Sequence, residues 1–423
     1  TIRASESRTT KEATPRIHGK IARPRQTSNE HTGRTMGISE AATTSDDKTN
    51  GSATTTTTSY VVRPPPIAAS LLETIGNTPL VRVPDRALPE ASRHATVLAK
   101  LELQNPGGSL KDRIALHMIR EAEERGDLRP GMTIVDFTSG NTGIGYAMVA
   151  AALGYECVVV MPKVRSMLER YAICRQFGAE VHLVNPALGA PGAVAYLERL
   201  VAEHPAKYWW SNQLANADNP AVHGVTTGPE IWEQTGGAVD VFVHGIGTGG
   251  CVAGVGAYLK AKKPSVQVVA LEPSESRVHT GAPPKSHGIV GWSPGIHATF
   301  LEGHGRPAAE LSDAPRGVVD EWGHVATADA VQTATHVCRT MGLMCGPSSG
   351  AALKCAFDIA ARDDSNGKTI VVVIPSHAIR YCAHPLWGAT MKEANAALPA
   401  GDAPCTDKEQ PVLLWDSAAY VEE

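Results

Sequence analysis

The sequence lacks the excess of positive charge that nucleic-acid-binding proteins carry, and it lacks the long apolar runs that membrane-spanning proteins need. Its 39 lysine and arginine residues are outnumbered by 43 acidic residues, which gives a net charge of -4. Such a chain has no basic field for nucleic acid or for an anionic membrane surface. Its most apolar stretch, at 146–162, is interrupted at Gly154 and Glu156, before it could cross a bilayer. These absences favour small metabolites as partners.

The sequence also lacks paired cysteine motifs. Its eight cysteines show no CxxC spacing, which in a chain of this size indicates reduced thiols in an intracellular compartment. What the chain does have is length and apolar content, with 423 residues of which 42% are hydrophobic. That is enough for two domains of ordinary size.

The first 66 residues differ in composition from the rest. They are rich in Ser, Thr and Arg, and they show no apolar periodicity that could bury a face. We expect a disordered N-terminal extension over residues 1–66, bounded by the stiff RPPPI linker at 63–67. An organellar transit peptide is one interpretation of its Arg-rich basic excess, and an untargeted tail is the other. The expected location is the cytoplasm, or a plastid or mitochondrion if the extension is a transit peptide.

Beyond residue 67, short apolar runs alternate with amphipathic segments. TVLAKLEL (96–103) precedes a helix from 110, and VDVFVHG (239–245) precedes a helix that ends near 262. Strands that alternate with helices form parallel sheets covered on both faces. Ligands bind such folds where a strand ends and the next helix begins. We therefore expect an α/β fold with its site residues at these junctions.

The stretch NPGGSLKDR (105–113) places a lysine in the first turn of a predicted helix. Its two glycines permit a sharp turn or a close approach, Ser109 is a good N-cap, and Asp112 follows at capping-box spacing. The periodic apolar pattern predicts a helix that stops at Gly126. The positive end of the helix dipole should lower the pKa of Lys111, as a Schiff-base lysine requires. The alternative is an exposed lysine in an ordinary first turn.

Two further junctions carry small polar residues. FTSGNTGIG (137–145) offers hydroxyls, an amide and free N–H groups at a helix start, which is a good seat for a carboxylate. CGPSSGAA (345–352) offers Ser348 and Ser349, whose hydroxyls could equally be N-caps.

A third junction is rich in glycine. Gly245, Gly247 and Gly250 satisfy GxGxxG, and Glu272 ends the next predicted strand, as in a dinucleotide-binding fingerprint. Backbone N–H groups at a helix start would cradle any phosphate in the same way, so the motif predicts a phosphate and does not identify its carrier.

Together these junctions supply a lysine, a phosphate cradle, a carboxylate seat and a neutral hydroxyl, as a pyridoxal phosphate enzyme acting on an amino acid requires. NPGGSLKDRIALHMI, TSGNTGIG, TTGPEIWEQTGG, GIGTGG and SSGAA, in this order across roughly residues 71–381, resemble O-acetylserine sulfhydrylase (cysteine synthase), of the fold type II pyridoxal phosphate enzymes. The resemblance implies a tryptophan synthase β-like fold of two three-layer αβα domains with the active site in the cleft between them. It implies a large domain of 67–108 and 216–388, a small domain of 109–215 and a C-terminal tail of 389–423.

The resemblance also implies a role for each motif residue. Lys111 would hold pyridoxal 5'-phosphate as a Schiff base and later act as the base at the substrate Cα. Asn141 would bond the ring oxygen, and Ser348 would face the pyridine nitrogen. The phosphate would lie against Gly247, Thr248, Gly249 and Gly250, with Cys251 beside them. The substrate carboxylate would be held by Thr138, Ser139, Thr142 and Gln213. No metal is expected.

The resemblance also implies the reaction, and the neutral serine at the ring nitrogen is consistent with it. A carboxylate there would keep the ring protonated, whereas a serine favours prompt loss of a β-leaving group over a long-lived carbanion. Acetate would leave O-acetyl-L-serine, an enzyme-bound aminoacrylate would remain, and sulfide would add to give L-cysteine. The resemblance also implies a homodimer.

Three segments depart from the family pattern. Cys251 stands where the phosphate loop usually ends in threonine, and a thiol is a weak donor. SHGIVGWSP (286–294) puts Val290 and Trp292 in the closing loop, where small residues are usual. PSHAIRYCAHPLW replaces PSxGERYLS from residue 375. The His377, Cys382 and His384 of this segment match no standard metal-ligand spacing.

Several other functions stay open. Cystathionine β-synthase shares most of these motifs, and β-cyanoalanine or S-sulfocysteine synthases would use the same intermediate with another nucleophile. A non-enzyme alternative is a weakly active paralogue that binds the tail of serine acetyltransferase. A dinucleotide-binding protein is disfavoured because it leaves Lys111 unexplained.

Overall fold

The computed structural model describes residues 67–398, except 139, 293–294 and 302–316. The predicted extension over 1–66 and the end of the predicted tail therefore lie outside the described residues. The described residues belong to one compact unit, and the boundaries of the large and small domains stay a prediction.

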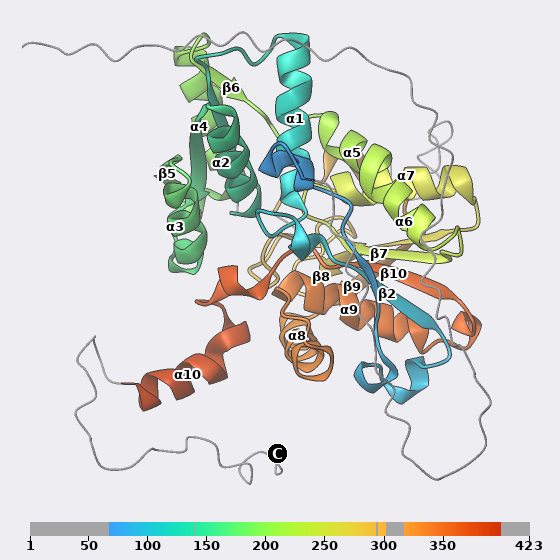
Figure 1. The fold of residues 1–423 in the computed structure, drawn as a ribbon. Coiled ribbons are helices and arrows are strands. Elements are labelled where there is room, and N and C mark those ends of the chain that lie inside the picture. Colours follow the sequence, from blue (N-terminus) through green and yellow to red (C-terminus); the bar gives the residue numbers. More distant parts are fainter. Residues whose placement is uncertain (1–66, 139, 293–294, 302–316, 399–423) are drawn as a thin grey trace, which may run out of the picture. The chain divides into compact units, whose positions relative to one another are not determined.

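The strands form two sheets, one of six strands and one of four (Figure 1). The larger sheet has the order β1-β2-β10-β7-β8-β9, in which only the β1–β2 pair is antiparallel. Its strands are β1 (Leu80–Arg82), β2 (Thr96–Lys100), β7 (Val241–Gly245), β8 (Gln267–Pro273), β9 (Glu321–Val325) and β10 (Thr369–Val373). The smaller sheet has the order β5-β4-β3-β6 and is parallel throughout. Its strands are β3 (Thr133–Phe137), β4 (Glu156–Pro162), β5 (Glu180–Val184) and β6 (Tyr208–Trp210).

Helices cover both faces of each sheet, as the alternating pattern predicted. On the larger sheet, alternate residues of β7 face opposite cores: Val243 packs toward α8 and α9, and Phe242 packs toward α6 and α7. On the smaller sheet, one core includes α1, α2 and α3 and the other includes α4. The helices are α1 (Lys111–Arg125), α2 (Asn141–Leu153), α3 (Leu168–Gln176), α4 (Gly189–Glu203), α5 (Asp218–Val222), α6 (Gly228–Gln234), α7 (Gly250–Lys262), α8 (Thr327–Met341), α9 (Pro347–Ala360) and α10 (Gly388–Ala397).

Helix α1 follows its sequence pattern closely. Ile114 and Met118 are fully buried against the smaller sheet, and each such side chain contributes about 1.5–3 kcal/mol of hydrophobic stabilisation. The helix ends where Gly126 adopts a left-handed conformation with φ of 77°, which confirms the predicted stop. A π-helical turn, His223–Thr227, joins α5 to α6. Within the described part of the chain, no helix is long and apolar enough to cross a membrane.

Candidate active site

An open cavity of about 830 Å³, including its solvent-open part, lies at the carboxyl ends of strands from both sheets. It brings together most of the residues predicted from the sequence. Those that line it are Lys111, Thr138, Asn141, Thr142, Gln213, Gly247, Thr248 and Ser348. Gly249, Gly250 and Cys251 follow directly as the start of α7, whereas Ser139 lies outside the described residues.

Lys111 is the first residue of α1, and its side chain faces the cavity. None of the described residues forms a hydrogen bond or ion pair with its Nζ. Burial lowers the pKa of this amine, and the nearby Cys251 opposes the shift only in part. The predicted direction of the pKa shift is therefore right, and its largest cause is desolvation. The alternative of an exposed lysine is wrong.

The glycines before Lys111 leave room for two charged side chains. The Asp112 carboxylate accepts a hydrogen bond from the Gly107 N–H at 2.6 Å, and a Cβ on Gly107 would lie 2.6 Å from Asp112 Oδ1. Gly108 has a φ of 78°, and a side chain there would collide with the Arg380 guanidinium. Burial raises the pKa of Asp112 to about 7. Ser109 Oγ accepts from the Lys111 N–H at 3.3 Å.

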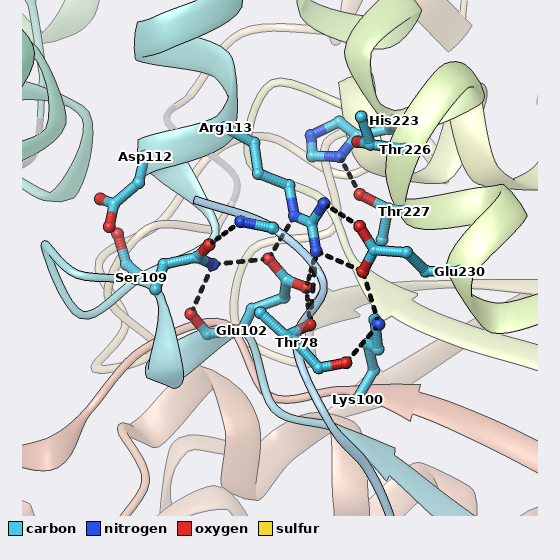
Figure 2. A network of polar contacts seen from close by, with 12 residues as sticks. Thr78, Lys100, Glu102, Ser109, Asp112, Arg113, His223, Thr226, Thr227 and Glu230 are labelled. Carbon is cyan, nitrogen blue, oxygen red and sulfur yellow. Dashed lines mark hydrogen bonds and ion pairs between the residues drawn. The ribbon is translucent and has the colours of Figure 1, made fainter. Parts of the chain in front are cut away.

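A buried network of ion pairs holds the first turn of α1 in place (Figure 2). Arg113 donates to both oxygens of Glu102 at 2.7 Å and to both oxygens of Glu230 at 2.6 and 2.7 Å. Lys100 Nζ donates to Glu230 at 2.7 Å and to the Thr78 carbonyl at 2.7 Å. The pKa of Glu230 is about 2, because the bonds from Arg113 and Lys100 outweigh its desolvation. The network connects β2, α1 and α6 through Arg113, which lies two residues after Lys111. This network was not predicted from the sequence.

The glycine-rich turn before α7 forms a cradle for an anion. No described residue accepts a hydrogen bond from the N–H groups of Gly247, Thr248 or Gly249. Gly249 has a φ of 85°, and a Cβ on Gly250 would overlap the amide oxygen of Asn219. Free N–H groups at a helix start bind phosphate well. Cys251 is buried in the first turn, and burial raises its pKa to about 12, so it stays a neutral thiol.

The start of α2 and the nearby Gln213 add further polar groups to the cavity lining. Thr142 Oγ1 donates to Gln213 Oε1 at 2.7 Å, and Gln213 Nε2 donates to the Phe137 carbonyl at 2.7 Å, which leaves one Nε2 hydrogen free. Asp136 holds this arrangement, because its carboxylate accepts from the Gln213 N–H at 3.1 Å. Burial raises the pKa of Asp136 to about 6. Asp136 was missed in the sequence, although a carboxylate in the buried MTIVDF run was a signal.

Two more groups with no partner face the cavity. Ser348 lies in the first turn of α9, whose N-cap is Gly346, so the N-cap interpretation of the two serines is wrong. The Ser348 hydroxyl has no partner among the described residues. His244 also lines the cavity, and its buried Nδ1 lacks a partner. Burial, with a smaller effect of Lys111, lowers the pKa of His244 to about 3, so the ring is neutral. Sequence analysis did not single out His244.

The altered closing loop contributes to the wall of the cavity. Val290 and Trp292 both line it, and Trp292 is 95% buried against the larger sheet. Its indole ring occupies the space into which a side chain at Gly245 would project. Gly245 thus serves the packing of this ring, in addition to any role in ligand binding.

Gly245→Ala is expected to lower the free energy of unfolding by about 1–3 kcal/mol, because the added methyl overpacks against Trp292. Urea unfolding measures this. Gly388→Ala is the control, since nothing lies within 4 Å of a Cβ there. The loss should shrink when Trp292 is also replaced by leucine. An equal loss with and without the indole would show that the clash is not the cause.

Two alternatives from the sequence find no support in the geometry. The Glu272 carboxylate is engaged by His279 and Thr280 and does not line the cavity, which removes the acidic partner of a dinucleotide site. His377 and His384 accept hydrogen bonds from backbone N–H groups two residues on. Over residues 67–398, less the gaps named above, no three His, Cys, Asp or Glu side chains gather as a metal site would need.

Comparison with known proteins agrees with this geometry. Residues 71–376 match the family model described as pyridoxal-phosphate dependent enzyme. The chain belongs to this family. It is 40% identical over 319 residues to a cysteine synthase of Staphylococcus aureus, covering 75% of this chain and 96% of that protein. The crystal structure of O-acetylserine sulfhydrylase isoform 3 from Entamoeba histolytica matches with a TM-score of 0.70 and 40% identity, covering 78% of this chain and 95% of that one. An O-acetylserine-dependent cystathionine β-synthase from Helicobacter pylori matches with a TM-score of 0.67 and 30% identity, covering 76% and 99%. The predicted family and fold class are confirmed.

The residues present fit the cofactor of this family. A desolvated amine, a glycine cradle that side chains would fill, and an unpartnered hydroxyl face one cavity. A buried polar atom without a partner, His244 Nδ1, belongs to a residue that lines the cavity. Such an atom costs about 1–3 kcal/mol, so a ligand that pairs with it gains affinity.

Proposed function

We propose that this chain is a cysteine synthase, which replaces the acetate of O-acetyl-L-serine by sulfide with pyridoxal 5'-phosphate as cofactor. The observation that carries this proposal is the single cavity that holds Lys111, Asn141 and the cradle of α7, in a chain that spans 96% of a cysteine synthase. When bound, the cofactor supplies an electron sink conjugated to the substrate Cα.

Lys111 attaches the cofactor and moves the Cα proton. Desolvation lowers the pKa of its Nζ and so favours the neutral form, which is nucleophilic and basic. The same amine can take the proton from the substrate Cα and return it to the product. No described side chain competes for Nζ, so it is free for both tasks.

The other residues bind and orient. The free N–H groups of Gly247, Thr248 and Gly249 would hold the phosphate, and the Ser348 hydroxyl would face the ring nitrogen without protonating it. Thr138, Thr142 and Gln213, together with the start of α2, would hold the substrate carboxylate. Asp136 keeps Gln213 in place through its backbone N–H.

The wall of Val290 and Trp292 favours a small nucleophile. Both side chains line the cavity and are larger than the residues usual in this loop, so they would leave less room for an incoming nucleophile. Sulfide needs less room than homocysteine, which is the nucleophile of a cystathionine synthase. The geometry therefore supports sulfide over homocysteine.

The test is a two-step assay on the purified protein loaded with cofactor. O-Acetyl-L-serine should change the visible absorbance of the cofactor, and sulfide should restore it at least about tenfold faster than homocysteine, with cysteine as the product. Faster recovery with homocysteine would instead identify a cystathionine synthase. A protein that binds no cofactor would contradict the proposal altogether and favour the binding paralogue. Homodimer formation and binding of serine acetyltransferase remain predictions.

A further inference from the structure

The orientation of one amide decides what the cavity offers to a ligand at Asn141. This residue opens α2 and lines the cavity. Its amide has a donor end and an acceptor end of nearly the same shape, so the side chain itself has little preference for which end faces inward. Neighbouring residues must fix the choice.

Arg380 lies against the oxygen end of that amide. Its Nη1 donates to Asn141 Oδ1 at 3.1 Å, and a guanidinium has only donors, so it cannot accept from the nitrogen end. Asn141 Nδ2 donates to the Tyr381 hydroxyl at 2.8 Å, which in turn bonds Ser376 Oγ at 2.7 Å. One Nδ2 hydrogen is left for a ligand.

Arg380 is itself held by hydrogen bonds with Gly107 and Arg170. It is 93% buried, and its Nη2 donates to the carbonyl of Gly107, in the loop before Lys111. Arg170 Nη1 donates to the Arg380 carbonyl at 2.9 Å. The Arg170 guanidinium also lies 4.9 Å from the centre of the Tyr381 ring. The segment after residue 375 departs from the family pattern but keeps Arg380 and Tyr381.

We propose that Arg380 is a positioning residue that fixes the Asn141 amide with an N–H, and not its carbonyl oxygen, toward the cavity. This inference rests on the proposed function, together with the role that the family resemblance implies for Asn141 at the ring oxygen of the cofactor. A ring oxygen that carries negative charge accepts from an N–H and is repelled by a carbonyl. Because Arg380 also donates to the Gly107 carbonyl, it connects the loop before Lys111 with the start of α2 at Asn141.

The experiment measures the affinity of the cofactor-free protein for pyridoxal 5'-phosphate. Arg380→Met keeps much of the side-chain volume but removes the donors, and the Kd should rise about tenfold or more. Arg380→Lys keeps one donor and should recover part of the loss. The pH at which the visible absorbance of bound cofactor changes should shift in the methionine variant. Ile379→Ala, an exposed neighbour, is the matched control and should change neither value.

A double-mutant cycle with Asn141→Ala separates positioning from a general structural role. Without the amide, Arg380→Met should change the Kd less than about twofold. An equal loss in both backgrounds, or a lysine variant no better than methionine, would overturn the role of Arg380 alone. Wild-type protein that fails to bind the cofactor would overturn the proposed function as well.

Discussion

Lys111→Ala is expected to abolish covalent attachment of pyridoxal 5'-phosphate and to lower kcat/KM for cysteine formation by about 10³-fold or more. The amine is the only described lysine Nζ that lines the cavity, and burial lowers its pKa. No other side chain there can both bond the cofactor aldehyde and carry a proton at Cα. Borohydride reduction followed by peptide mass analysis gives the attachment site directly.

Lys354→Ala is the control for this substitution. Lys354 is part-exposed and pairs with Asp358 on the surface of α9, away from the cavity lining, so its loss should leave attachment and rate unchanged. Peptide masses that place the reduced cofactor on a lysine other than Lys111 in the wild-type protein would contradict the assignment. Retained cysteine formation in a folded Lys111→Ala variant would do the same.

Arg113→Met is expected to lower the free energy of unfolding by about 3–5 kcal/mol, as removal of one member of a buried ion pair does. Arg113 satisfies Glu102 and Glu230 at once, and the Glu102 side chain is fully buried (Figure 2). Without the guanidinium, Glu102 is left as a buried charge with too few partners. Urea unfolding at pH 7 measures the loss.

Arg120→Met, in the same helix, is the matched control. Its partner Glu123 is part-exposed, and such a surface pair contributes at most about 1 kcal/mol. Adding Glu102→Gln to Arg113→Met should restore part of the stability, because it removes the unpaired charge. A loss below about 1 kcal/mol for Arg113→Met would show that the network does not stabilise the first turn of α1.

Local patterns predicted much of the site. The spacing of apolar residues in α1, the left-handed Gly126 and the glycines before α7 follow from rules that act over a few residues. Those rules placed Lys111 and Thr248 at helix starts, and parallel strands bring such starts to the same edge of a sheet. The structure then brought the predicted residues around one cavity.

Other features depend on residues far apart in the sequence. The contacts of Arg380 with Gly107 and Asn141 join segments more than 230 residues apart. The burial of Trp292 over Gly245, like the low pKa of Lys111, depends on what surrounds each group in space. No local pattern contains that information.

The sequence by itself determined the helices, the strands and the types of residue at their junctions, because backbone preference and apolar periodicity are short-range. Only the tertiary structure decided the burial of Lys111, the orientation of Asn141 and the set of residues that line the cavity. Desolvation, hydrogen-bond direction and packing depend on which distant segments meet, and those meetings exist only in the folded chain.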